Sequence, residues 1–198
     1  MLTKSDRTRQ FIIEKAAHLF NVKGYAATSM ADIIQATGLA KGGIYGNFKN
    51  KEEIALEAFE YASKKVMDEM TFKIKAQPTY AGKLEAILQF YRNYTVQSPI
   101  EGGCPILNFS VDCDDTNPEL KSRVRHAIEL MLGTLVYLIQ QGIKKGEFRK
   151  EVNAELAADI IYSQIEGGIM MSKTYGNSKK LNRLLEYLKT YIDKDLKV

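Results

Sequence analysis

The stretch Thr28–Lys51 reads TSMADIIQATGLAKGGIYGNFKNK, and it is the most informative part of the chain. Ser29, with Asp32 three residues later, predicts the capped start of a helix, and Gly38 predicts its end. After a Gly-Leu-Ala turn, a second short helix is predicted over residues 41–48. Two short helices joined by a tight turn form a helix-turn-helix, the geometry that places the second helix in a DNA major groove.

The second of these helices has an unusual composition, since it contains Gly42, Gly43 and Gly46. Each glycine costs about 1 kcal/mol relative to alanine in a helix interior, so packing must hold the helix. Ile44 and Phe48 are spaced i, i+4 and are expected to face the other helices. The outer side is then predicted to carry Lys41, Tyr45, Asn47 and the three glycines.

Charge is distributed unevenly along the chain. Residues 1–51 contain eight Lys and Arg against three acidic residues, whereas the remaining residues contain 20 against 21. Basic residues that neutralise phosphates supply most of the sequence-independent affinity for DNA. The basic segment therefore fits a DNA-facing module, and an ordinary solvated basic surface is the alternative.

Bulk composition excludes several classes of protein. With 198 residues, 45% of them hydrophobic, the chain can bury a sizeable core. The apolar run at Phe11–Ile13 is too short for a signal peptide, and no run approaches the ~18 apolar residues of a membrane span. We therefore expect a cytoplasmic protein that does not insert into a membrane. Cys104 and Cys113 have neither disulfide-framework nor zinc-site spacing, so no metal and no cofactor are expected.

Helical patterns continue through the rest of the chain. A first helix is predicted over residues 4–23 and a long fourth helix from Asn50 to about residue 75, with a break at 77–79. Later helices are predicted around 84–91, 105–111, 116–146 (capped by Thr116), 153–175 and 178–196. No strand-like alternation is present, so the fold class is all-α with about nine helices. We expect a helix-turn-helix domain over residues 1–50 and a larger helical domain over 51–198.

Residues 8–60 closely resemble the TetR family of bacterial transcriptional regulators. The matching segments are Ala16–Phe20, Gly24–Tyr25, Thr28–Ile33, Ala36–Leu39 and Gly43–Glu52. The remaining chain resembles the family only in the number and order of its helices. The resemblance implies a homodimer that binds a palindromic DNA operator and releases it when a small molecule fills the helical domain.

The resemblance also implies roles for individual residues. Thr28 and Ser29 would contact phosphates, and Tyr45 and Lys51 would clamp the DNA backbone. The outward positions of the recognition helix are Lys41, Gly42, Gly43, Tyr45, Gly46 and Asn47. Lys41 and Asn47 can read guanine and adenine edges. Because glycines replace residues that would read bases, we expect DNA shape to supply a substantial share of the specificity.

The effector site is predicted from apolar and phenolic residues whose helices should converge in the larger domain. These residues are Tyr91, Tyr94, Phe109, Met131, Leu135, Tyr162 and Ile165. Such a lining suits a hydrophobic or aromatic small molecule, although ordinary core packing explains the same residues equally well. Cys104 precedes a predicted helix, where free amides can lower a thiol pKa. A response to electrophiles is one hypothesis for it, and a buried inert thiol is the alternative.

The last two predicted helices contain the residues from which a dimer is expected. They contain a leucine-rich stripe and a Gly-Gly pair that permits close helix approach, namely Gly167, Gly168, Leu181, Leu184, Leu185, Leu188 and Ile192. The stripe could pack onto the chain's own core. A two-fold dimer is the alternative that the family implies, and it matches the symmetry of a palindromic site.

Two other functions are alternatives to a ligand-responsive regulator. An enzyme using Cys104 leaves the basic helix-turn-helix unexplained, and His18 and His126 lack a nucleophile at a recognisable spacing, so no catalytic residues are expected. The acidic group Asp112, Asp114 and Asp115 lacks a calcium-loop pattern and is interpreted as a solvated turn. A nonspecific architectural DNA-binding protein would show neither sequence preference nor release by a ligand. We therefore expect a ligand-responsive repressor, although repression and activation are not distinguished by the sequence.

Overall fold

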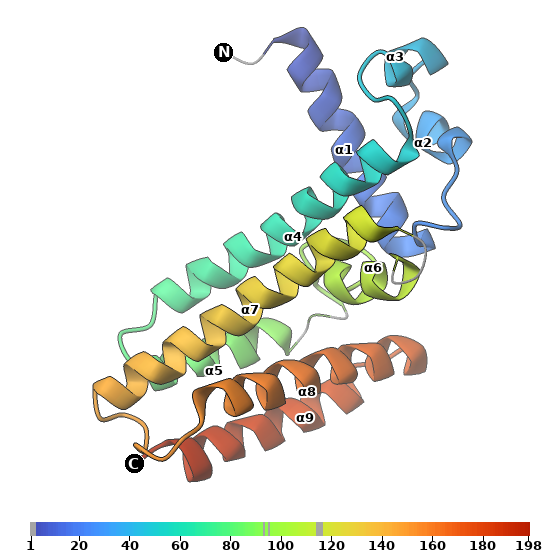
Figure 1. Cartoon of the computed structure of the whole chain (residues 1–198). Coiled ribbons are helices and arrows are strands. Elements are labelled where there is room, and N and C mark those ends of the chain that lie inside the picture. Colours follow the sequence, from blue (N-terminus) through green and yellow to red (C-terminus); the bar gives the residue numbers. More distant parts are fainter. Residues whose placement is uncertain (1–2, 93, 95, 114–116) are drawn as a thin grey trace. The chain divides into compact units, whose positions relative to one another are not determined.

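The computed structural model of the chain describes residues 3–92, 94, 96–113 and 117–198. Over these residues the chain forms nine α-helices and no β-strand (Figure 1), which confirms the all-α prediction. The helices are α1 (Lys4–Lys23), α2 (Met30–Thr37), α3 (Lys41–Tyr45), α4 (Lys51–Lys75), α5 (Tyr80–Tyr91), α6 (Pro105–Cys113), α7 (Pro118–Lys144), α8 (Ala154–Tyr175) and α9 (Lys179–Tyr191). A π-helical turn, Ile192–Leu196, extends α9.

Packing divides the chain into two compact units. Unit 1 comprises Met1–Val66 and Pro99–Arg125, and unit 2 comprises Met67–Ser98 and His126–Val198. Helices α4 and α7 each contribute residues to both units. The domain boundary predicted at residue 50 follows the helix-turn-helix pattern and stays a prediction.

The caps predicted around α2 are present. Ser29 Oγ accepts a hydrogen bond from Asp32 N at 3.1 Å, while Asp32 Oδ2 accepts one from Ser29 N at 2.8 Å. Gly38 ends the helix in the left-handed conformation, with φ +66°, which a residue without a Cβ adopts readily. These local bonds fix both ends of α2.

Helix α3 is shorter than predicted, because it ends at Tyr45 and not at Phe48. The amides of Asn47 and Phe48 both donate to the carbonyl of Ile44, so a tight turn follows the helix. Ile44 and Phe48 are both buried, as their spacing predicted. The glycines weaken the helix, and burial of these two side chains holds it in unit 1.

Unit 1 also contains α6 and the loop before it. Asn21 on α1 donates to the carbonyls of Glu101 (2.7 Å) and Gly103 (3.0 Å), and Asn108 Nδ2 donates to Asn21 Oδ1 at 2.8 Å. Gly102 has φ +99°, and a Cβ there would lie 2.5 Å from the carbonyl oxygen of Asn21. At Gly102 the loop therefore lies so close to α1 that only a glycine fits.

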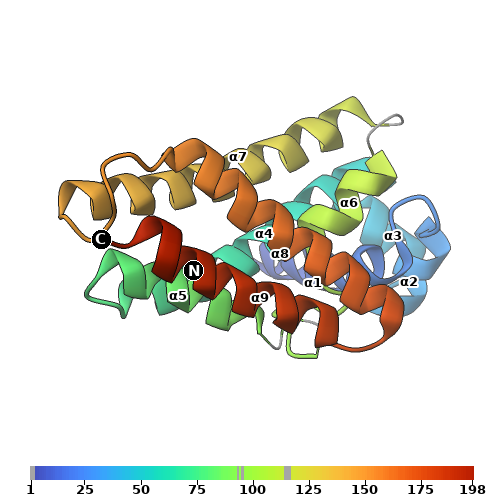
Figure 2. The same cartoon turned by 90° about the horizontal axis from the view of Figure 1, so that it is seen from below.

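In unit 2, α8 and α9 pack side by side (Figure 2). A Cβ on Gly168 would lie 2.9 Å from Leu181 Cδ1, so this glycine provides the close approach between the two helices. Asn153 caps α8 through the amides of Glu155 and Leu156, as predicted.

Asn117 caps α7 by accepting a hydrogen bond from the amide of Leu120 at 2.9 Å. The predicted cap Thr116 lies outside the described residues, as do Asp114 and Asp115 of the acidic group. Among the described helices, none combines the length and apolar composition that crossing a membrane requires.

Candidate functional site

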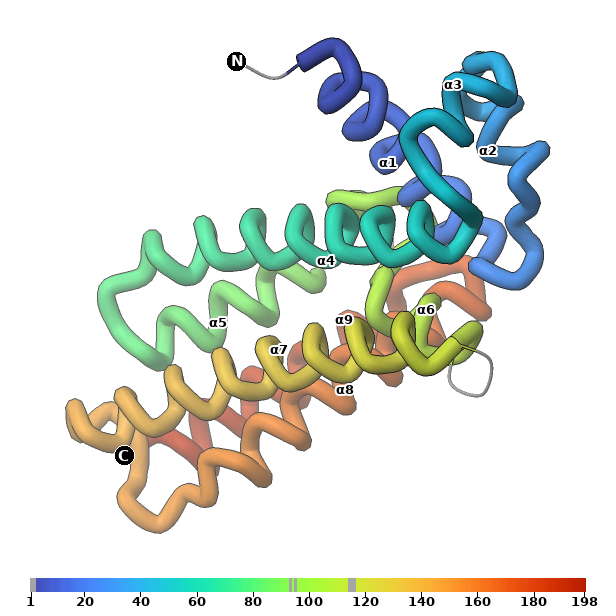
Figure 3. Tube along the Cα trace, turned by 45° about the horizontal axis from the view of Figure 1, so that its top comes forward, coloured from blue at the N-terminus to red at the C-terminus, as the bar shows by residue number. Residues whose placement is uncertain are grey.

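The outer face of α3 is formed by Lys41, Gly42, Tyr45 and Gly46, all of which are exposed, while Gly43 is half-buried. Figure 3 follows the trace from α2 through α3 into α4. Lys41 Nζ lies 5.6 Å from the centre of the Tyr45 ring. A Cβ on Gly42 would meet no atom within 4 Å, so the fold of the chain does not require a glycine there. The face combines a cation, a phenol and bare backbone.

Ser29 lies exposed at the start of α2. Its hydroxyl donates to Asp32 Oδ2 at 2.7 Å, and Lys23 Nζ lies 2.6 Å from Asp32 Oδ1. The Lys23 ammonium, followed by the hydrogen bonds from Ser29, holds the pKa of the Asp32 carboxyl far below its usual value. The start of α2 is thus an ordered, ionised cap.

Two residues predicted to contact phosphates make bonds within unit 1. Thr28 is 1% exposed, and its hydroxyl donates to the carbonyl of Gly24 at 2.7 Å. Lys51 Nζ donates to the carbonyls of Tyr25 (2.9 Å) and Thr28 (3.0 Å) and lies 4.3 Å from the Tyr25 ring centre. In this conformation both side chains stabilise the connection between α1 and α2, and their contacts with DNA stay predictions.

Asn47 is half-buried and not fully on the outer side. Its Nδ2 donates to the carbonyl of Gly43 at 2.8 Å, and its Oδ1 accepts from Ser5 Oγ at 3.3 Å. The first bond provides a partner for a backbone carbonyl of α3, and the second connects the turn after α3 to α1. Reading an adenine through this amide, as the sequence predicts, would have to use its second N–H and the second lone pair of its oxygen, or replace these bonds.

Arg9, one of the eight basic residues counted in the segment 1–51, lies against α4. Its guanidinium donates to Glu53 Oε1 at 2.9 Å and to Glu57 Oε2 at 3.2 Å. No local pattern reveals this pairing, because the partners lie more than 40 residues away in the sequence. The charge of Arg9 is therefore neutralised inside unit 1.

The predicted effector residues are all buried, but they are divided between the two units. Tyr91 and Tyr94 pack together in unit 2 with ring centres 5.0 Å apart. Phe109 belongs to unit 1, where its ring lies 5.1 Å from that of Phe59. The residues that remain in unit 2 are Met131, Leu135, Tyr162 and Ile165. Burial is equally consistent with core packing, so their role as an effector site stays a prediction.

Cys104 lies directly before α6 and is 3% exposed. Both Cys104 and Cys113 are free thiols. Burial away from water disfavours the thiolate that reacts with electrophiles. This burial fits the alternative of an inert thiol, and the response of Cys104 to electrophiles stays a prediction.

Most of the predicted dimer residues are covered by the chain itself. Gly168, Leu181, Leu185, Leu188 and Ile192 are buried within unit 2. By contrast, Gly167 and Leu184 are half-exposed. Five of the seven residues therefore pack into the chain's own core, as the first alternative stated.

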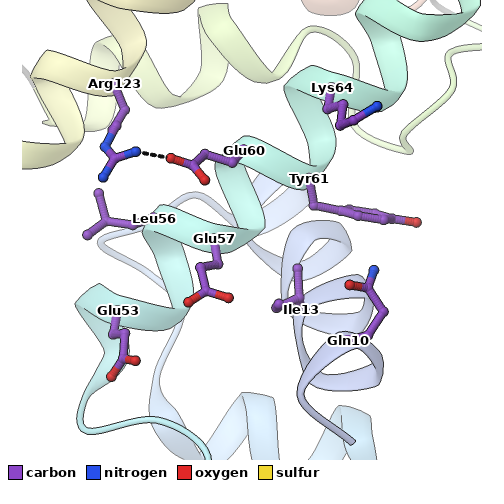
Figure 4. Close-up of a pocket in the computed structure, with 9 residues that line it drawn as sticks. All are labelled: Gln10, Ile13, Glu53, Leu56, Glu57, Glu60, Tyr61, Lys64 and Arg123. Atoms are coloured by element: carbon purple, nitrogen blue, oxygen red, sulfur yellow. Dashed lines mark hydrogen bonds and ion pairs between the residues drawn. The ribbon is translucent and has the colours of Figure 1, made fainter. Parts of the chain in front are cut away.

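The described residues form a groove in each of the two units. A groove of about 540 Å³ in unit 1 lies along α1 and α4 (Figure 4). A groove of about 410 Å³ in unit 2 is lined by residues from Arg149–Leu156 and by Tyr191, Asp195 and Leu196. Neither groove is lined by a predicted effector residue.

Comparison with known proteins covers both parts of the chain. Residues 12–58 match the family described as "Bacterial regulatory proteins, tetR family", and residues 81–188 match "Tetracyclin repressor-like, C-terminal domain". The chain is 26% identical over 184 residues to the HTH-type transcriptional repressor DhaR of Mycobacterium sp. (strain GP1), covering 89% of this chain and 88% of that protein.

Solved structures agree over the full length. A TetR transcriptional regulator from Chloroflexus aurantiacus J-10-FL is 40% identical with a TM-score of 0.96, and 100% of each chain is covered. A TetR-family regulator from Cytophaga hutchinsonii is 39% identical with a TM-score of 0.94, covering 100% of this chain and 98% of that one. With a helix-turn-helix at its amino terminus and family matches over more than half of its length, the chain belongs to the TetR family of bacterial transcriptional regulators.

Proposed function

We propose that the protein is a repressor whose homodimer binds a palindromic operator through the outer face of α3 and leaves it when a small molecule binds. The observation that supports the proposal is the exposed, glycine-rich face of α3. At Gly42 the fold has room for a Cβ, so folding alone does not explain the glycine there. Bare backbone allows a duplex to approach more closely than any side chain would. Such a regulator acts on chromosomal DNA in the cytoplasm.

Lys41, Tyr45 and Ser29 are the side chains best placed for DNA. All three are exposed, and an ammonium, a phenol and a hydroxyl can each donate to phosphate oxygens. Lys41 can also donate to guanine O6 and N7 in the major groove. With few base-reading side chains on this face, specificity rests partly on the shape and deformability of the duplex.

The dimer surface that we propose is the outer face of α8 and α9. Gly167 and Leu184 from the predicted set lie there, next in helical register to Met170 (52% exposed) and Tyr187 (59% exposed). Apolar side chains so exposed on adjacent helices favour burial against a second copy. A two-fold axis through this surface would present two copies of α3 to the two half-sites of a palindrome.

The effector that we propose is a hydrophobic or aromatic small molecule bound in unit 2. Tyr91, Tyr94 and Tyr162 bring phenol groups into a mainly apolar interior. Apolar walls with a few polar groups are typical of small-molecule sites in proteins. Release from DNA follows if the ligand binds a conformation that the operator-bound dimer does not adopt.

The test is selection of bound sequences from random duplex DNA, followed by a screen of hydrophobic and aromatic compounds for release of the selected duplex. The proposal predicts enrichment of a palindrome and release by at least one compound class. Binding without enrichment would instead favour the nonspecific architectural alternative. Enrichment without release by any compound would contradict the ligand-response part.

A further inference from the structure

The guanidinium of Arg9 on α1 donates hydrogen bonds to two carboxylates and one backbone carbonyl. It donates to Glu53 Oε1 at 2.9 Å and to both carboxylate oxygens of Glu57, with Nε at 3.2 Å from Oε2. Nη1 donates to the backbone carbonyl of Asn47, and the guanidinium carbon lies 4.0 Å from the centre of the Phe48 ring. One side chain therefore joins α1, α4 and the turn that follows α3.

Helix α3 depends on such outside support. It has five residues, two of them glycines, and its N-cap residue Ala40 makes no side-chain cap bond. A helix of this length is unstable by itself because nucleation is costly. The direction in which α3 projects is therefore set by the groups that hold its ends, and Arg9 binds the carbonyl of Asn47 just beyond its carboxyl end.

The geometry of these bonds suits arginine in particular. Glu53 and Glu57 are spaced i, i+4 on α4, so both carboxylates lie on one face of that helix. A guanidinium presents planar, forked donors that match two carboxylates and a carbonyl at once, which an ammonium cannot do. The side chains of Arg9, Glu53 and Glu57 are 32%, 32% and 33% exposed, so the pairs are partly shielded from water.

Electrostatics within the cluster agree with ionised pairs. The hydrogen bond to Glu57 is the main cause that raises the pKa of Arg9. The pKa of Glu53 is lowered, first by the backbone amide of Lys49 and then by Arg9. Since two carboxylates flank one guanidinium, Arg9 adds little positive charge to the surface around α3.

Figure 4 shows the acidic face of α4 from which these carboxylates project. Glu53, Glu57 and Glu60 follow one another along the helix, and Glu60 pairs with Arg123 of α7. Gln10 and Ile13 of α1 form the opposite wall of the groove. Arg9 thus connects this face of α4 to the turn that follows α3.

We propose that Arg9 is a positioning residue for DNA recognition: with Glu53, Glu57 and the Asn47 carbonyl, it fixes the carboxyl end of α3 against α4 and does not itself contact phosphate. We call these four groups the Arg9 clamp. The proposal rests on the proposed function, since it requires that the face of α3 binds DNA.

The substitution Glu57→Gln distinguishes the Arg9 clamp from a direct contact between Arg9 and phosphate, because the two predict opposite changes in DNA affinity. Glu57→Gln removes a negative charge near the DNA-binding face, so simple electrostatics predicts tighter binding. If Glu57 instead holds Arg9 in place, the same substitution weakens binding because α3 loses its fixed position. Arg9→Lys separates the two roles as well, since it keeps the charge and loses the forked geometry.

The experiment measures the affinity for the selected operator duplex over a range of salt concentrations. We expect Arg9→Lys and Glu57→Gln each to bind about tenfold more weakly, the size expected for loss of a charge-assisted hydrogen-bond network. The slope of log affinity against log salt should stay at the wild-type value, because no phosphate contact is lost. The matched controls are Arg7→Ala and Glu14→Gln, at exposed positions on the same helix, and neither should reproduce this combination.

Wild-type affinity in Arg9→Lys, or tighter binding by Glu57→Gln, would overturn the proposal. So would a salt slope for Arg9→Ala that falls by about 0.9, the value for one lost phosphate contact. Glu57→Gln keeps the pair between Arg9 and Glu53, so its result decides the question even where an Arg9 variant fails to fold. A wild-type protein without any preferred duplex would refute the proposed function, whereas wild-type binding in all variants would refute only the clamp.

Discussion

At the residue scale, a substitution of Gly42 should change the free energy of unfolding and the affinity for DNA in opposite directions. Its Cβ position is open, so Gly42→Ala is sterically acceptable and should raise the free energy of unfolding by about 0.5 kcal/mol through helix propensity. The added methyl group would stand between the backbone and the duplex, and we expect affinity for the selected operator to fall. Thermal unfolding and fluorescence anisotropy measure the two effects.

Gly46→Ala is the control for this prediction, because a Cβ there would lie 3.0 Å from the carbonyl of Gly42 and no gain in stability is expected. Unchanged operator affinity in Gly42→Ala would show that bare backbone at this position is not used for DNA.

The sequence predicted some of these residues well and others poorly, for a physical reason. Ile44 and Phe48 were predicted as anchors because helical spacing is a local property. The bonds of Lys51 and Arg9 were not predicted, because their partners are backbone carbonyls and carboxylates brought together only by the fold. A basic side chain in a basic segment gives no sign of whether it faces solvent or its own chain.

At the scale of elements, the buried amide of Asn21 joins α1 to the loop before α6. Asn21→Ala removes two donors and one acceptor, which leaves the carbonyls of Glu101 and Gly103 and the amide of Asn108 without these partners. Asn108 Nδ2 keeps its bonds to the carbonyls of Asn21 and Gly102, so the cost falls on the two part-buried carbonyls of Glu101 and Gly103. At about 1 kcal/mol for each lost partner, we expect a loss of about 2 kcal/mol in the free energy of unfolding. Urea denaturation measures it.

Gln10→Ala, at an exposed position on the same helix, should change stability by less than about 0.5 kcal/mol. A similar small change in Asn21→Ala would mean that water replaces the lost bonds and that the amide does not fasten the loop.

Element boundaries followed local chemistry wherever that chemistry was present. The Ser29–Asp32 box, Gly38 and Asn153 marked their helix ends correctly. The end of α3 was placed three residues too late, because the turn after Tyr45 depends on contacts to Asn47 from outside the helix. Most of the fold could therefore be read from the sequence, whereas the exact end of the recognition helix could not.

At the scale of the whole molecule, the outer face of α8 and α9 should control assembly. Tyr187→Glu places a charge in the proposed interface and should produce a species near the 22.4 kDa mass of one chain. Operator affinity should fall with it, because the two half-sites are no longer bound together. Sedimentation velocity measures the mass.

Lys189→Glu, at an exposed position of α9 outside that apolar face, should remain dimeric. A dimer in Tyr187→Glu would move the interface elsewhere on the molecule.

Operator recognition by the face of α3 requires that the intact protein distinguish one duplex from another. The deciding measurement is the ratio of affinities for the selected duplex and for a scrambled duplex of equal composition, at about 0.15 M salt. We predict a ratio of about 10³ or more for the wild type and a much smaller one for Lys41→Ala combined with Tyr45→Ala. Equal affinities for the two duplexes would contradict the assignment of the α3 face to operator recognition.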